Sequence, residues 1–285
     1  MRPITPVLLL LVLSVGVARA APVVVGTYAY PGRDRAAAVR PLADFVAATT
    51  QRPVEVRVWP SPSALVDGFR AGQADVIVPN LHAYLQARAG AVTLPVPDVP
   101  PSQAARYRSV IVGRGLHGIA ELTPQRAASL RLALVGPDSA SGGFVPLARL
   151  REAGLEQASF AAVVHAGSHE AARLALQQGQ VDVAALAADV YDAAPLDGAS
   201  LLWRSDPIPP GPLLCRADPR LPCDAIARAL LDAHRQAPAV IEALRAGWPE
   251  FGDASRFVEA GDLAAGFVLE TGPPPTAPGA AAPQE

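Results

Sequence analysis

The chain alternates between short apolar runs and longer segments in which apolar residues recur every three or four positions. Apolar runs bounded by proline or glycine are typical of strands, and the longer period is typical of amphipathic helices. Between residues 23 and 96 the pattern predicts strands at 23–27, 54–58, 75–79 and 92–96. It predicts helices between them at 34–50, 61–72 and 81–85. This alternation is typical of a mostly parallel sheet with helices on both faces.

A second alternation of the same kind begins after residue 113. It predicts strands at 132–135, 160–165, 181–186 and 201–203, and helices at 144–153, 169–178 and 188–193. The chain then returns through a predicted strand at 213–216 and helices at 223–234, 240–246 and 255–267.

Two such α/β segments joined by extended passages predict two lobes with a ligand cleft between them. In open α/β sheets, ligands bind beyond the carboxyl ends of the strands, so we expect the cleft at that edge of each sheet. We expect lobe one at 22–107 plus 213–265 and lobe two at 113–205, with hinge strands near 107–112 and 205–212.

The two ends of the chain do not fit either alternation. A short basic start, an apolar run over 7–17 and the small residues Ala18 and Ala20 are typical of a cleaved signal peptide over 1–20. A retained N-terminal anchor is the alternative. Residues 272–285 are rich in Pro, Ala and Gly and predict a disordered tail. An exported chain of this kind is expected in the periplasm.

Composition narrows the possible partners. All 24 basic residues are Arg, and they are outnumbered by 26 acidic residues, which leaves a net charge of −2. Nucleic-acid binding needs a basic surface, so it is not expected here. Cys215 and Cys223 are the only cysteines, and an even number in an exported chain favours a disulfide between them. Two separately buried thiols are the alternative.

The segment 136–146, GPDSASGGFVP, contains the strongest candidate chemistry. It joins a predicted strand to a predicted helix and contains two hydroxyls, Ser139 and Ser141, followed by two glycines. The N–H groups at a helix start lack intrahelical partners, and glycine lets a ligand approach the backbone closely. We therefore predict a small-oxyanion site at this turn. The alternative is that both serines only cap a turn or a helix.

Other functions fit the residue pattern less well. A secreted hydrolase would use Ser139 or Ser141 with His169 and Asp189, but neither serine lies in a G-x-S-x-G elbow. No catalytic residue is therefore predicted. The five histidines show no zinc-ligand spacing, so no metal site or cofactor is expected either.

Taken together, the segments resemble the PhnD-type phosphate/phosphite/phosphonate-binding proteins of ABC importers. The markers, in chain order, are ALVDGFRAGQADV, YRSVIV, GPDSASGGFVP, HAGSHEAARLALQQGQVDVAAL and SDPIPPGPL. The resemblance extends from residue 23 to about 246. It implies a type 2 periplasmic-binding-protein fold, two α/β lobes that close on a ligand, and a membrane permease as partner. We expect a monomer; a ligand sensor for a kinase is the alternative with the same fold.

The resemblance also assigns residues. Ser139, Ser141 and Gly142 match the family's Ser-Thr-Ser-Gly turn, with Ala140 in place of Thr, so that only its backbone N–H is expected to donate. His169 matches the family histidine, and Asp189 matches the acidic position that receives a ligand amine in aminoalkylphosphonate binders.

The first-lobe side of the site departs from the family pattern. The aromatic-Gly pair that often follows the third strand is absent, and its place is taken by Val78, Pro79 and Asn80. The candidates for first-lobe contacts are Tyr28, Tyr30, Asn80 and Tyr84. Of Tyr28 and Tyr30, one is expected to face the cleft and the other to pack, and Asn80 is equally suited to cap a helix.

Overall fold

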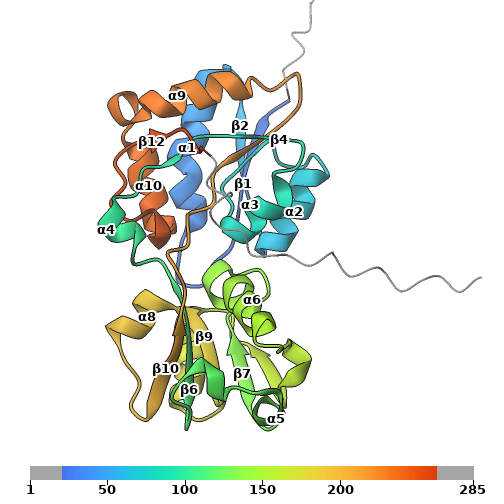
Figure 1. Ribbon diagram of the computed structural model, residues 1–285. Helices are drawn as coiled ribbons and strands as arrows, with labels where there is room; N and C mark the ends of the chain where they lie inside the picture. Colours follow the sequence, from blue (N-terminus) through green and yellow to red (C-terminus); the bar gives the residue numbers. More distant parts are fainter. Residues whose placement is uncertain (1–20, 262–285) are drawn as a thin grey trace, which may run out of the picture.

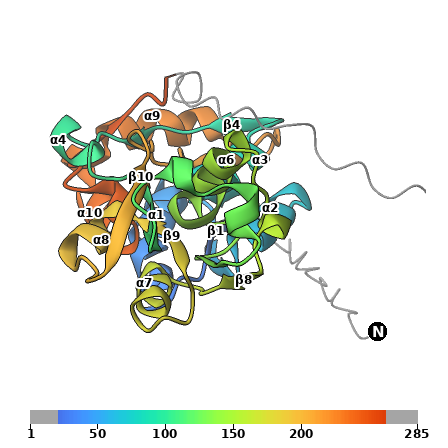
Figure 2. The ribbon, with the colours of Figure 1, turned by 60° about the horizontal axis from the view of Figure 1, so that its bottom comes forward.

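Two five-stranded sheets dominate the computed structural model, which describes residues 21–261 (Figure 1). We call each sheet with its helices a lobe. When the molecule is turned so that the second sheet comes forward, the first sheet and its helices lie behind it (Figure 2). The two lobes are therefore stacked end to end, and the extended passages of the chain connect them.

The first lobe is built on a sheet with the strand order β2-β1-β3-β11-β4. β1 is parallel to β2 and β3, whereas β11 is antiparallel to β3 and β4. Its strands are β1 (Val23–Tyr28), β2 (Val54–Trp59), β3 (Val76–Ile77), β4 (Ala91–Thr93) and β11 (Leu214–Arg216). Its helices are α1 (Arg35–Thr50), α2 (Pro62–Arg70), α3 (Leu81–Ala87), α4 (Pro101–Ala104), α9 (Cys223–Gln236) and α10 (Ala239–Gly247).

The second lobe has the strand order β10-β6-β9-β7-β8. β9, β7 and β8 are parallel, and β6 is antiparallel to both of its neighbours. Its strands are β6 (Ser109–Arg114), β7 (Arg131–Leu134), β8 (Ala162–His165), β9 (Val183–Ala187) and β10 (Ala199–Arg204). Its helices are α5 (Pro124–Ala127), α6 (Val145–Glu152), α7 (His169–Gln177) and α8 (Ala188–Ala193), with short 3₁₀ turns at Ile119–Glu121 and Gln157–Ser159.

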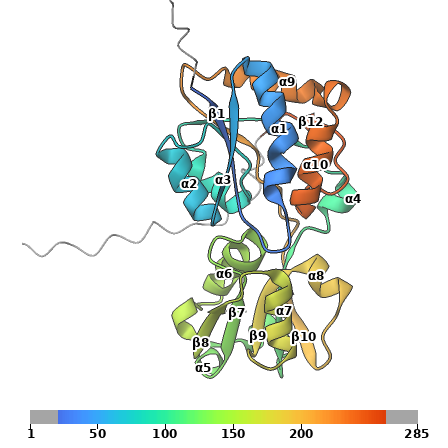
Figure 3. The same ribbon diagram turned by 180° about the vertical axis from the view of Figure 1, so that it is seen from behind.

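Helix α1 shows how the apolar spacing determines the packing. Its buried residues Val39, Leu42 and Val46 recur every three or four positions and form one face. That face lies against the first sheet and α10, while α7 covers the second sheet in the same way (Figure 3). The helix begins at Arg35 and continues through Pro41.

The two connecting passages are hydrogen-bonded to each other between the lobes. The Ile208 N–H donates to the Tyr107 carbonyl at 2.7 Å, and the Ser205 N–H donates to the Ser109 carbonyl at 2.9 Å. The Ser205 hydroxyl in turn accepts from the Ser109 N–H. The predicted hinge segments therefore lie side by side.

Two predicted elements differ from the structure. The predicted helix at 255–267 is wrong over its described part, because Phe257–Val258 forms strand β12 and pairs with β5 (Val96–Pro97). The predicted strand at 92–96 is likewise divided into β4 and β5. The remainder of that helix, the predicted signal peptide and the predicted tail lie outside the described residues.

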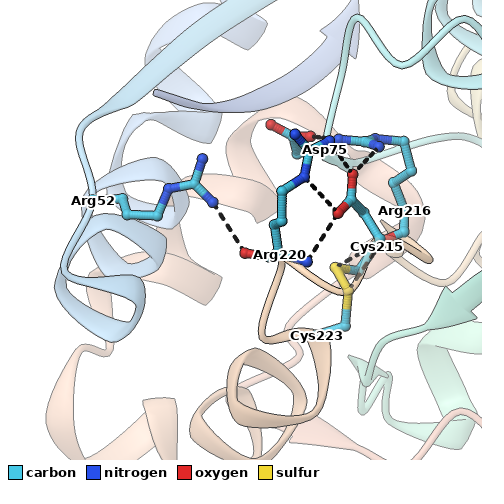
Figure 4. Close-up of a disulfide and its surroundings, with 7 residues drawn as sticks. Arg52, Asp75, Cys215, Arg216, Arg220 and Cys223 are labelled. Carbon is cyan, nitrogen blue, oxygen red and sulfur yellow. Dashed lines mark hydrogen bonds and ion pairs between the residues drawn. A yellow bond between two sulfur atoms is a disulfide. The ribbon is translucent and has the colours of Figure 1, made fainter. Parts of the chain in front are cut away.

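A disulfide between Cys215 and Cys223 joins the end of β11 to the start of α9 (Figure 4). Arg216 beside it forms ion pairs with Asp75 and Asp218, and Arg220 pairs with the same Asp218 carboxylate. These two arginines hold the pKa of Asp218 well below its ordinary value through hydrogen bonds. The loop that leads into α9 is thus held both covalently and by charge.

Two kinds of feature are absent from residues 21–261. None of their helices is long and apolar enough to cross a bilayer. Within the same residues, no three or more His, Cys, Asp or Glu side chains are grouped so as to hold a metal ion.

Candidate functional site

A cavity of about 370 Å³ lies between the lobes and collects nearly all of the predicted ligand residues. Pockets that hold small organic ligands usually measure about 300–1,000 Å³. The predicted residues that line the cavity are Tyr28, Tyr30, Asn80, Ser139, Ala140, Ser141, His169 and Asp189. Gly142 and Tyr84 are the candidate residues that do not line it.

The turn after β7 is wider than an ordinary helix start. Residues Ala140–Phe144 form a π-helical turn, in which the Phe144 N–H donates to the Ser139 carbonyl at 2.8 Å. The Ser139 hydroxyl accepts from the Gly142 N–H at 3.1 Å, so Ser139 is a cap and also a cavity residue. The N–H groups of Ala140 and Ser141 have no hydrogen-bond partner among residues 21–261. They are therefore available to an anion.

Both glycines of this turn are required by close packing. A Cβ at Gly142 would come within 2.3 Å of the Val135 side chain, and one at Gly143 within 2.0 Å of the Gly136 carbonyl oxygen. The absence of side chains therefore lets the turn fold back onto the end of β7. Gly142 contributes to the site by allowing this geometry, although it does not face the cavity.

His169 is held as a neutral hydrogen-bond donor. Its Nδ1 accepts from the Ala187 N–H at 3.0 Å, and burial lowers the pKa of its imidazole to about 4. With Nδ1 as acceptor, the proton of the neutral ring is on Nε2. Nε2 lies 3.4 Å from the Ser141 hydroxyl. An N–H donor and a buried hydroxyl thus lie side by side at the cavity wall.

The first-lobe candidates form the opposite wall. Tyr28 and Tyr30 both line the cavity, but Tyr28 is 4% exposed and packs in the first-lobe core, whereas Tyr30 is only partly buried. The Tyr30 hydroxyl lies 3.5 Å from the backbone N–H of His169. Burial raises the pKa of both phenols, so both hydroxyls stay protonated at neutral pH.

Asn80 and Asp189 differ in how strongly they are held. Asn80 is buried: its side-chain oxygen caps α3 by accepting from the Ala83 N–H, and its amide donates to the Asp138 carbonyl, each at 2.8 Å. Asp189 is exposed at the start of α8, and its carboxylate accepts from the Val190 N–H. Both residues line the cavity, but only Asn80 is fixed by contacts to both lobes.

Sequence reasoning missed several further residues of the cavity wall, among them Arg35, Tyr107 and Glu250. Burial raises the pKa of Tyr107 well above its ordinary value, and the neighbouring Ser141 hydroxyl opposes that shift. Arg35 could have been found from spacing, because it lies three and four positions before Ala38 and Val39 on the buried face of α1. No local pattern indicates Tyr107 or Glu250.

The second-lobe turn is also bonded directly to the first lobe. The Asp138 carboxylate accepts from the Ser63 N–H at 3.2 Å, in addition to the Asn80 contact. Beside it, the rings of His82 and Phe144 stack across the lobes at 4.4 Å between centroids. The lobes are therefore in contact next to the anion turn.

Solved structures share this two-lobed architecture. PhnD1 of Prochlorococcus marinus in complex with methylphosphonate is 19% identical, with a TM-score of 0.63 over 84% of this chain and 93% of its own. The XAC2383 protein of Xanthomonas citri bound to chloride ion is also 19% identical, with a TM-score of 0.68 over 85% of this chain and 93% of its own. A binding protein component of an ABC phosphonate transporter from Pseudomonas aeruginosa, PA3383, is 19% identical, with a TM-score of 0.62 over 88% of this chain and 86% of its own. No curated protein sequence matches significantly.

The arrangement of the two sheets is that of the type 2 periplasmic-binding-protein fold, as the sequence predicted. A family model for the periplasmic substrate-binding protein of phosphonate ABC transporters matches residues 28–261. The chain belongs to this family, which confirms the resemblance seen in the sequence. The family is one of transport components that bind a substrate in the periplasm and work with an ABC transporter.

Proposed function

We propose that the cavity binds a phosphorus oxyanion, a phosphonate, phosphite or phosphate, through the turn 139–142 and His169. The observation that supports this best is the convergence of donors on one wall. The free N–H groups of Ala140 and Ser141, the Ser141 hydroxyl and the neutral Nε2–H of His169 all lie there. Hydrogen bonds to a charged acceptor are roughly twice as strong as neutral ones, so few donors suffice.

The proposed cycle rests on the lobe division expected from the sequence, 22–107 plus 213–265 and 113–205. Ligand binding closes the lobes about the paired segments near 107–112 and 205–212, and the closed monomer delivers its ligand to a membrane permease. The protein has no catalytic role in this cycle. The N-terminal segment serves for export to the periplasm.

The direct test is calorimetry of the purified protein with phosphate, phosphite, methylphosphonate and sulfate. A phosphorus oxyanion should bind, and at a hundredfold excess over its Kd it should raise the free energy of unfolding by about 3 kcal/mol. Binding of none of the phosphorus compounds, together with binding of an unrelated solute, would overturn the proposal.

A matched pair of serine variants separates binding from capping. Ser139 caps the anion turn and Ser168 caps α7, each by accepting an N–H at 3.1 Å, but only Ser139 lines the cavity. Ser139→Ala and Ser168→Ala should each cost about 1 kcal/mol of stability. Only Ser139→Ala should weaken binding, by about tenfold or more, because it removes a hydrogen bond to a charged ligand. Equal affinities in the two variants would leave Ser139 with the capping role alone.

A further inference from the structure

Arg35 is a buried cation in the cavity wall that has no ion-pair partner among residues 21–261. The residue is 5% exposed, and no carboxylate in this part of the chain lies within 4.0 Å of its guanidinium nitrogens. Nε donates to the Gly247 carbonyl at 3.2 Å, while Nη1 is enclosed and has no hydrogen-bond partner in this part of the chain. A buried charge without a partner is strongly unfavourable, so the missing partner needs an explanation.

Aromatic rings surround the guanidinium of Arg35. Its central carbon lies 4.1 Å from the ring centroid of Tyr28, 4.5 Å from that of Trp248 and 5.2 Å from that of Tyr30. Aromatic groups arranged in this way can hold the cationic group of a ligand. Here the cation of the chain itself occupies them. Stacking covers the faces of a planar guanidinium but not its edge. The N–H groups along that edge match the geometry of a carboxylate or a phosphate.

The cavity is also lined by the charged residues Arg33, Arg106, Glu170, Asp189, Glu250 and Asp253, and none of these carboxylates forms an ion pair with Arg35. Glu250 lines the same wall without forming an ion pair, and burial raises the pKa of its carboxyl, although the charge of Arg35 opposes this shift. Asp253 is paired with Arg245 at 2.9 Å. The cavity of about 370 Å³ extends from the Ser141 wall to Arg35, and this is more space than a single tetrahedral oxyanion occupies.

We propose that Arg35 forms a second anion subsite, so that the preferred ligand has an oxyanion at one end and a carboxylate or comparable acceptor at the other. This rests on the proposed function, in which the Ser139–Ser141 wall holds the first oxyanion. The subsite selects phosphonates with an acidic far end over aminoalkylphosphonates, because Arg35 repels an ammonium group and already occupies the aromatic rings. The class predicted is the small phosphonocarboxylates.

The wild-type protein gives the first test, by calorimetry with phosphonoacetate, methylphosphonate and 2-aminoethylphosphonate. Phosphonoacetate should bind at least tenfold more tightly than methylphosphonate, and 2-aminoethylphosphonate more weakly than either. If 2-aminoethylphosphonate is preferred, or if the carboxylate gives no gain, the subsite proposal is wrong while the proposed function stands. If no phosphonate or phosphate binds, both proposals fail.

The second test assigns the preference to Arg35. Arg35→Met keeps most of the aliphatic stem and removes the charge, and Arg40→Met makes the same change on an exposed position of α1 outside the cavity. Arg35→Met should reduce the preference for phosphonoacetate over methylphosphonate at least tenfold, while Arg40→Met leaves it unchanged. An unchanged preference in folded Arg35→Met protein would overturn the proposal. Should this variant not fold, Arg35→Lys replaces it, and loss of bidentate contact should still lower the preference.

Discussion

His169 shows how one residue acquires its role from its surroundings. A solvated histidine titrates near pH 6.5, but burial lowers the pKa of this one to about 4. The bond from the Ala187 N–H fixes which nitrogen has the proton. The ring therefore acts as a neutral donor at any pH above about 5. The family match identified the residue, while its protonation state follows from the structure.

This shift predicts a specific dependence of stability on pH. Above pH 6.5 the ring is neutral in both the folded and the unfolded chain. As the pH falls from 6.5 towards 4, only the unfolded chain takes up the proton. The free energy of unfolding therefore falls by up to about 3 kcal/mol. Denaturant unfolding at several pH values should show this loss in the wild type and not in His169→Gln. His117→Gln, the same change at an exposed position, is the control and should keep the loss seen in the wild type. If the free energy of unfolding depends on pH in the same way in the wild type and in His169→Gln, the expectation is wrong.

At the scale of elements, local patterns predicted most of the fold, and non-local contacts explain the exceptions. Helices α7 and α8 were predicted to within one residue because caps and apolar spacing are local signals. Strand β12 was missed because it depends on pairing with β5, far away in the sequence. The same holds for the site: the hydroxyls of the turn were visible in the sequence, whereas the groups around Arg35 come from β1 and from the end of α10, far away in the sequence.

The link between β11 and α9 gives a prediction at this scale. The disulfide spans eight positions, and closing so short a loop in the unfolded chain corresponds to about 2.5 kcal/mol in the chain-entropy model. Replacing both cysteines by Ala should lower the free energy of unfolding by about this amount in a denaturant titration. The fold should be retained, because the Arg216 ion pairs with Asp75 and Asp218 still hold the loop. A double variant as stable as the oxidised wild type would show that the bridge constrains little.

At the scale of the whole molecule, the two lobes meet at the anion turn itself. Asp138 precedes Ser139 and accepts from the Ser63 N–H of the first lobe, while its carbonyl accepts from the Asn80 side chain. The turn that we propose to bind the ligand therefore also contacts the opposite lobe. Binding and closure are therefore expected to be coupled, since any shift of this turn alters both.

Asp138→Ala tests this coupling. The substitution removes the acceptor for the Ser63 N–H but leaves the cavity-lining side chains in place. The ligand-free protein should open further, with a larger radius of gyration by small-angle X-ray scattering, and the affinity for a bound phosphorus oxyanion should fall about three- to tenfold. A net loss of one hydrogen bond corresponds to about 1 kcal/mol, which sets this range. Asp192→Ala is the matched control, because its ion pair with Arg204 lies wholly within the second lobe. An equal loss of affinity in both variants would mean that the Asp138 contact does not link closure to binding.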